Sequence, residues 1–280
     1  MALMMNRENP MRLDPDGPNR VPVVLSSQVQ DAHCQDQELF RHIKPISIKP
    51  PKWGKLVSLT DQESAGAEAF RLISVRLYDM RHDRHLKSLL ITSTIPQEGK
   101  SMVSANLACT LAKGGHEKVL LIEGDVRRPT LAQKLGMESR AGLCELLRKE
   151  VSLFQSIVHL PDAKMWVLPS GQVDGNPLEL LQSQKLSPLM TQLVGYFDWI
   201  IIDSPPVLPV ADASVWSAFA DGILLVTRYG ITQKKELIRG VNQIDKRKLV
   251  GAVLNYSKNR CYFDYYYQRG RLSPIKWTKP

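Results

Sequence analysis

Residues 93–101 read Ser-Thr-Ile-Pro-Gln-Glu-Gly-Lys-Ser. The apolar run at residues 89–92 comes directly before this stretch and predicts a buried strand, while residues 101–113 repeat apolar side chains at helical spacing. A strand, a tight loop, Gly-Lys-Ser and a helix follow one another in a phosphate-binding loop. Thr94 stands where the common form of this loop has its first glycine, so an ordinary surface turn that contains Gly-Lys remains an alternative.

The chemistry of a phosphate loop follows from its geometry. Backbone N–H groups at a helix N-terminus face an anion, Lys100 can reach the outer phosphates of a nucleotide, and the Ser101 hydroxyl can bind Mg²⁺. We therefore expect a phosphate-binding set that comprises Thr94, Pro96, Gln97, Glu98, Gly99, Lys100, Ser101 and Met102.

Acidic residues follow two other apolar runs. Glu123 ends one run, Asp125 comes two positions later, and Asp203 ends another run. A nucleotide loop that uses Mg²⁺ needs an acid at the tip of a neighbouring strand to hold the metal. Phosphoryl transfer to a hydroxyl also needs a group that accepts or orients its proton. The three carboxylates suit both tasks, although an acid after a strand can also cap the next helix. Arg127 and Arg128 can pair with these acids or with phosphate.

The order of the elements predicts the fold class. Strand-like runs at residues 89–92, 118–123, 165–168, 199–203, 222–226 and 250–254 alternate with helical patterns near 61–82, 101–113, 143–149, 177–183, 186–193, 211–219 and 233–244. Such alternation predicts an α/β fold, a mainly parallel sheet with helices on both faces. Ligands of these sheets gather at the carboxyl ends of the strands, where the motifs above fall. Thr60 and Glu63 predict a capping box at the start of the first helix.

Composition limits the class of protein. The chain has 280 residues, of which 43% are hydrophobic, and no run approaches the ~20 apolar residues that span a bilayer. Residues 1–20 lack the apolar segment of a signal peptide, so we expect a soluble, cytoplasmic protein. The cysteines and histidines are too widely spaced to suggest a metal site or a disulfide framework.

The two ends of the chain differ from its middle. Residues 1–55 contain seven prolines and predict a disordered Pro-rich arm, and residues 56–257 would form the phosphate-loop domain. Residues 258–280 would be a flexible tail that is basic and rich in tyrosine; residues 256–280 hold six Lys/Arg and one acid, within a net charge of +9. Such a tail can meet an anionic membrane or an acidic partner, or remain solvated. Since no nucleic-acid-binding motif accompanies the charge, we expect no nucleic-acid partner.

Together these residues resemble the bacterial tyrosine kinases of capsule and exopolysaccharide synthesis, over about residues 68–257. The family's phosphate loop is similar to S-x-x-P-x-E-G-K-S and usually lacks the first glycine, as here at Thr94. A second motif resembles an apolar run with D-x-D-x-R-x-P and matches residues 121–129, and a third resembles I-I-I-D-x-P-P-V and matches residues 200–207. A C-terminal tyrosine cluster completes the pattern: Tyr262, Tyr265, Tyr266 and Tyr267.

The resemblance implies an ATP-dependent autokinase of the MinD/ParA-like branch of phosphate-loop proteins, with ATP and Mg²⁺ as cofactors. The tail tyrosines would be phosphorylated between neighbouring subunits. Lys100 would bind phosphate, Ser101, Asp125 and Asp203 would hold the metal, and Glu123 and Asp125 would assist the attacking tyrosine. Glu123 replaces the family's usual Asp, which lengthens this carboxylate by one methylene and predicts slow catalysis unless Asp125 compensates.

The resemblance also implies partners. The family's ring-forming motif resembles E-x-x-R-x-x-R; Glu68 and Arg71 fit it, Ser74 takes the last position and Arg76 lies two residues on. These residues would join subunits into a head-to-tail homo-oligomer. Such kinases are fused to a membrane-embedded polysaccharide chain-length regulator or stand alone and are activated by one. This chain resembles the stand-alone cytoplasmic form, recruited to the inner face of the plasma membrane by its partner, where peripheral membrane association is an expectation.

Phosphorylation of the tail would turn a basic segment acidic, which predicts a cycle in which subunits associate, modify one another and separate. The cycle would regulate polysaccharide polymerisation and export. Two alternatives stay open. One is a nucleotide-binding regulatory scaffold without kinase activity, which the replacement at Glu123 favours. The other is a MinD/ParA-like ATPase, although those resemble K-G-G-x-G-K-[ST] and Ile95 stands where their second lysine would be.

Overall fold

The computed structural model describes Phe40, residues 43–114 and residues 116–257. Tyr262, Tyr265, Tyr266 and Tyr267 of the predicted tail, and most of the predicted Pro-rich arm, lie outside these residues. Of the helices in the described part, none combines the length and the apolar character needed to cross a bilayer.

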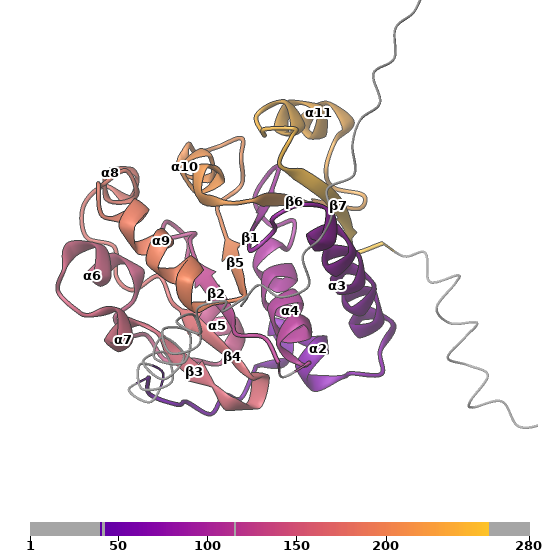
Figure 1. Ribbon diagram of the computed structural model, residues 1–280. Coiled ribbons are helices and arrows are strands. Elements are labelled where there is room, and N and C mark those ends of the chain that lie inside the picture. Colours follow the sequence, from indigo (N-terminus) through magenta and orange to yellow (C-terminus); the bar gives the residue numbers. More distant parts are fainter. Residues whose placement is uncertain (1–39, 41–42, 115, 258–280) are drawn as a thin grey trace, which may run out of the picture. The chain divides into compact units, whose positions relative to one another are not determined.

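The described residues form one seven-stranded sheet (Figure 1). Its strands are β1 (Ser88–Ser93), β2 (Val119–Glu123), β3 (Val158–Leu160), β4 (Met165–Leu168), β5 (Trp199–Asp203), β6 (Gly222–Arg228) and β7 (Leu249–Asn255). The strand order is β3-β4-β2-β5-β1-β6-β7, and every pair is parallel except β3 with β4. The prediction of a mainly parallel sheet is confirmed. The short antiparallel strand β3 was not predicted, because three residues are too few to show a period.

Helices cover both faces of the sheet, as predicted. One apolar core packs α2 (Val57–Thr60), α3 (Ala65–Asp83), α4 (Lys100–Ala112) and α5 (Leu131–Leu135) against it. The other core packs α6 (Leu143–Arg148), α7 (Leu153–Ser156), α8 (Pro177–Leu181), α9 (Leu186–Tyr196), α10 (Asp212–Phe219) and α11 (Lys234–Asn242) against the opposite face. In Figure 1 the central strands run between α4 and α9. Leu89 and Ile91 of β1 point to the first core and Leu90 to the second, the alternation expected of a strand.

Two features before β1 differ from the predictions. The capping box at Thr60 and Glu63 is wrong: α3 begins at Ala65, and the Ser64 hydroxyl caps it by accepting from the Ala67 N–H at 3.2 Å. Thr60 instead ends α2, where its hydroxyl donates to the Leu56 carbonyl at 3.0 Å.

Ordered structure also begins inside the predicted arm, before residue 56. Ile43 and Ile48 are buried, and the Ile46 N–H donates to the His159 carbonyl of β3 at 2.9 Å. Residues 52–54 then form a short 3₁₀ turn that leads into α2. This segment folds onto the domain because it adds an isolated bridge, Pro45 with His159, to the edge of the sheet and buries two isoleucines.

Candidate active site

The predicted phosphate loop connects β1 to α4, and its geometry depends on Gly99. This residue is the N-cap of α4 and has a φ of 97°, a left-handed conformation that glycine adopts readily. A Cβ at this position would overlap the side-chain amide of Asn255. The first N–H groups of the thirteen-residue α4 are thus presented at the loop, where a helix N-terminus favours an anion.

Glu98 holds the loop from inside. Its carboxylate is fully buried and accepts hydrogen bonds from the Ile95 N–H at 2.8 Å, the Arg228 N–H at 3.3 Å and the Thr232 hydroxyl. Asn255 donates to the Glu98 carbonyl at 2.8 Å. Glu98 therefore fixes the loop to the ends of β6 and β7.

The other predicted loop residues fall into two groups. Pro96 and Gln97 are exposed, and the Gln97 carbonyl accepts from the Arg228 guanidinium at 3.2 Å. Met102 packs its side chain against the first apolar core. The Thr94 hydroxyl is buried and has no hydrogen-bond partner among the described residues, and it lies against Gly240 of α11.

Lys100 is surrounded by acids. Its Nζ lies 2.6 Å from Asp125 Oδ2 and 4.0 Å from Asp203 Oδ1. Burial alone would lower the pKa of Lys100, but the charges of Asp203 and Asp125 outweigh burial and raise the pKa above its ordinary value. The ammonium group therefore keeps its charge in a site that is largely closed to solvent.

Asp203 is buried at the end of β5. Burial raises its pKa to about 6, against the opposing effects of Lys100 and of a hydrogen bond from Ser101. Ser104 also reaches its carboxylate, at 3.5 Å. The structure thus brings together Lys100, Ser101, Asp125 and Asp203, as the sequence predicts for residues at the carboxyl ends of neighbouring strands.

Glu123 is placed differently from the other acids. It pairs with Asp203 in the β2–β5 register, yet its carboxylate binds backbone groups. One oxygen accepts from the Leu131 and Ala132 N–H groups, at 2.6 and 3.3 Å, and the other accepts from the Ser170 N–H at 3.1 Å. Glu123 caps the start of α5 and holds the loop after β4, which was the alternative left open for an acid after a strand.

The two arginines after β2 also take separate places. Arg127 forms a two-point ion pair with the fully buried Asp212 of α10, with Nε 2.7 Å from Oδ2 and Nη2 3.0 Å from Oδ1. The hydrogen bond to Asp212 raises the pKa of Arg127. The Arg128 N–H donates to Asp125 Oδ1 at 3.2 Å. These contacts orient the β2–α5 loop so that Asp125 faces Lys100.

Four residues at the ends of β6 and β7 adjoin the loop and were not predicted: Arg228, Thr232, Asn255 and Tyr256. The Tyr256 ring has the Arg228 guanidinium 4.4 Å and the Lys55 ammonium 4.6 Å from its centre. No local pattern indicates these residues; the available signal was that β6 and β7 end at the same edge of the sheet as β1.

The predicted oligomer contacts lie together on α3, the helix that precedes β1 and the phosphate loop. Arg71 Nε lies 2.6 Å from Glu68 Oε2, and Arg76 is exposed. Ser74, which takes the last position of the motif, is buried and donates to the Arg71 carbonyl at 2.8 Å.

This chain is similar to known proteins in sequence and in fold. Residues 97–250 match the AAA domain family. The chain is 36% identical over 214 residues to tyrosine-protein kinase YwqD of Bacillus subtilis, a match that covers 76% of this chain and 90% of that protein. The fold is similar to the kinase domain of the Escherichia coli tyrosine kinase ETK, with a TM-score of 0.68 and 30% identity over 71% of this chain and 79% of that chain.

A more distant similarity is to the septum site-determining protein MinD of Pyrococcus horikoshii, complexed with Mg-ADP. The TM-score is 0.50 at 26% identity, over 62% of this chain and 72% of that chain. The fold is thus the MinD-like form of the phosphate-loop fold, and the sequence similarity is to kinases. The chain belongs to the family of bacterial tyrosine kinases of capsule and exopolysaccharide synthesis.

Proposed function

We propose that this chain is an ATP-dependent protein-tyrosine kinase that phosphorylates Tyr262, Tyr265, Tyr266 and Tyr267 of neighbouring subunits. The observation that carries the proposal is the convergence of Lys100, Ser101, Asp125 and Asp203 at the N-terminus of α4. Membership of the family supports tyrosine as the acceptor. Residues 262–267 contain four tyrosines that can serve as acceptors.

The donor set of the site fits Mg²⁺. Ser101, Asp203 and Asp125 offer oxygen ligands only, which Mg²⁺ prefers, and this ion usually takes one or two carboxylates and fills its shell with water and phosphate oxygens. In the described part of the chain no cluster of three or more His, Cys, Asp or Glu residues forms a cage, consistent with a metal that arrives with its nucleotide. When bound, Mg²⁺ would neutralise charge on the phosphates.

Lys100 and Asp125 supply the chemistry that the protein itself contributes. With nucleotide bound, Lys100 would turn from Asp125 to the outer phosphates, which leaves the Asp125 carboxylate without its 2.6 Å partner. Asp125 can then accept the proton of an acceptor tyrosine. The tyrosine oxygen forms a bond to the terminal phosphorus, the bond from this phosphorus to the bridging oxygen breaks, and ADP leaves.

Glu123 has a positioning role in this proposal. Both of its carboxylate oxygens accept hydrogen bonds from backbone N–H groups, and neither contacts Lys100. The family role in assisting the tyrosine therefore passes to Asp125.

We further propose that the kinase acts as a head-to-tail homo-oligomer, with Glu68, Arg71 and Arg76 at the contact. A membrane-embedded polysaccharide chain-length regulator would recruit it from the cytoplasm to the inner face of the plasma membrane and activate it. There the phosphorylation cycle would regulate capsular or exopolysaccharide polymerisation and export. Family membership supports these partners.

The test is to incubate the full chain with ATP and Mg²⁺ and to locate phosphate by mass spectrometry. Phosphate is expected on residues 262–267 of the wild-type chain and absent from Lys100→Met. A Lys100→Met chain with a distinguishable mass, mixed with wild type, should become phosphorylated if transfer occurs between subunits. The cytoplasmic segment of the activator is added in parallel, because an isolated kinase can need it.

A MinD-like ATPase is the second candidate, favoured by the structural use of Glu123 and the shared fold. The same experiment separates it from the kinase. Hydrolysis of ATP without any gain in protein mass, with activator present, would overturn the kinase proposal, and ATP binding without either reaction would indicate a regulatory scaffold.

A further inference from the structure

Helix α11 presents an unusual outer face. Lys234, Lys235, Ile238, Arg239 and Asn242 are exposed, while Gly240 is buried and the remaining positions are partly covered. Ile238 is four residues after Lys234 and three after Lys235, so an exposed isoleucine stands between cations on one face of the helix. About half of the Ile238 side chain is accessible to solvent (51%).

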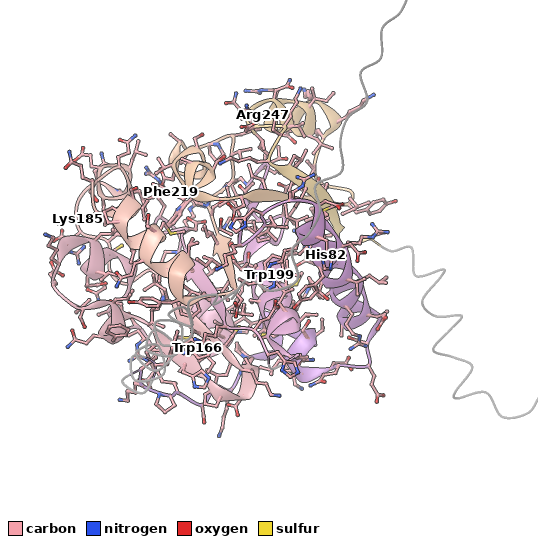
Figure 2. All side chains as sticks on the ribbon, in the orientation of Figure 1. His82, Trp166, Lys185, Trp199, Phe219 and Arg247 are labelled. Atoms are coloured by element: carbon pink, nitrogen blue, oxygen red, sulfur yellow. The ribbon has the colours of Figure 1, made fainter. Side chains whose placement is uncertain are left out.

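The loop before α11 extends this face. Tyr229 and Ile231, which follow β6, are each 54% exposed. We call Tyr229, Ile231, Lys234, Lys235, Ile238 and Arg239 the α11 surface. Within residues 229–248 there are six Lys/Arg and two acids. Figure 2 places Arg247, another of these cations, beside α11 and well away from Lys185.

The two acids of this region are already engaged. Glu236 accepts from the Gln233 N–H at 3.0 Å and so caps α11, while Asp245 pairs with Arg247 at 2.9 Å. In the described part of the chain, no carboxylate lies within 4.0 Å of the charged groups of Lys234, Lys235 or Arg239. Their charge is therefore available to an external partner.

We propose that the α11 surface docks directly on an anionic phospholipid bilayer. Cations next to exposed apolar side chains match such a surface, because lysine and arginine meet the headgroups while isoleucine and tyrosine enter the boundary of the acyl chains. A nucleic acid, or a protein surface that offers acidic groups alone, would use the three cations but would leave the isoleucines in water. The exposed isoleucines therefore favour lipid.

The buried side of α11 and Thr232, just before this helix, contact the phosphate loop. Thr232 binds Glu98 of the loop, and Gly240 lies against Thr94. Because Gly240 is buried, a bilayer held by the exposed face of α11 would lie across this helix from the loop, and it would position the kinase domain on the membrane independently of any protein partner. This contact is separate from the proposed reaction, because no member of the α11 surface contacts Lys100, Asp125 or Asp203 in the structure.

The test measures binding of the full chain to vesicles by sedimentation, with phosphatidylglycerol mixed into phosphatidylcholine, and with phosphatidylcholine alone. Three variants are compared with wild type: Lys234→Gln/Lys235→Gln/Arg239→Gln, Ile231→Ser/Ile238→Ser, and the control Lys149→Gln/Lys164→Gln/Lys185→Gln. The control removes the same charge from exposed lysines elsewhere, and all variants keep the basic tail. Thermal unfolding checks that each variant is folded.

The α11 charge variant is expected to bind anionic vesicles on the order of a hundredfold more weakly than wild type, and the control to bind within about threefold of it. The isoleucine variant should lose about tenfold on vesicles and nothing on heparin, a polyanion without an apolar phase. Equal losses in the α11 and control charge variants would overturn the proposal. So would an isoleucine variant that binds vesicles like wild type, since the surface would then be a general polyanion site.

Discussion

Burial disfavours the negative charge of Asp203. Its side chain is buried, and burial raises its pKa from 3.8 to about 6. The folded protein therefore binds this proton more tightly than the unfolded chain does, so the free energy of unfolding should fall as the pH rises between these two values. In the proposed function, the negative charge of Asp203 serves to bind the metal that accompanies the nucleotide.

We predict that Asp203→Asn stabilises the nucleotide-free protein at pH 7 by about 1–3 kcal/mol, because asparagine is neutral at every pH. Near pH 4, where the wild-type carboxyl is also protonated in the folded state, the difference should shrink to under ~1 kcal/mol. Urea unfolding at both pH values measures the effect. A gain of the same size at both would show that removal of the charge is not its cause.

Substitutions at Glu123 and Asp125 distinguish a structural acid from a catalytic one. Glu123→Gln leaves one amide N–H₂ facing a backbone N–H, so we predict a loss of about 1–3 kcal/mol in the free energy of unfolding. The kcat of the folded variant should stay within about tenfold of wild type, whereas loss of a general base lowers kcat by ~10²–10⁴-fold. The matched Asp125→Asn variant should show that larger loss. A reversed order of the two kcat values would return the catalytic role to Glu123.

At the scale of elements, the strands were the most predictable part of the fold. Runs such as residues 199–202 are apolar throughout because both faces of the strand are buried, and this pattern is local. The start of α3 was less predictable, since Thr60 and Ser64 both offer a capping hydroxyl and only packing decides between them. Residues that adjoin the phosphate loop from β6 and β7 could not be predicted, because parallel neighbours are distant in sequence.

The Thr94 side chain of the phosphate loop packs against Gly240 of α11. A Cβ on Gly240 would lie 2.8 Å from Thr94 Cγ2, so a glycine at residue 240 leaves room for the threonine side chain at residue 94. Gly→Ala within a helix normally stabilises by ~0.5–1 kcal/mol. We predict instead that Gly240→Ala lowers the free energy of unfolding by about 1–2 kcal/mol, because it overpacks a buried contact.

Thr94→Ala/Gly240→Ala should recover most of this loss, since it removes Cγ2 and the unpartnered hydroxyl of Thr94. A double-mutant cycle from urea unfolding gives the coupling energy, expected to be about 1 kcal/mol or more. Additive effects of the two substitutions would mean that the helix and the loop do not constrain each other.

At the scale of the whole molecule, the candidate site depends on segments that only the fold unites. Lys100 begins α4, Asp125 follows β2 and Asp203 ends β5, and their convergence followed from the predicted parallel sheet. The pairing of Arg127 with Asp212 is a feature of packing that the sequence left open. The N-terminal boundary of the domain also depends on packing. The proline content of the sequence indicates an arm, whereas two buried isoleucines anchor part of this arm to the domain.

We predict that a chain starting at Phe40 unfolds with the same free energy as the full chain, whereas a chain starting at Leu56 loses about 3–6 kcal/mol. The longer chain retains Ile43 and Ile48, which are 4% and 7% exposed. It also retains the Ile48 N–H bond to Asp162 at 3.3 Å and the Lys55 carbonyl that accepts from Asn106 at 3.0 Å. Urea unfolding of both chains beside the full chain measures the difference. If the chain that starts at Leu56 is as stable as the full chain, residues 43–55 contribute nothing to the domain and the boundary belongs at residue 56.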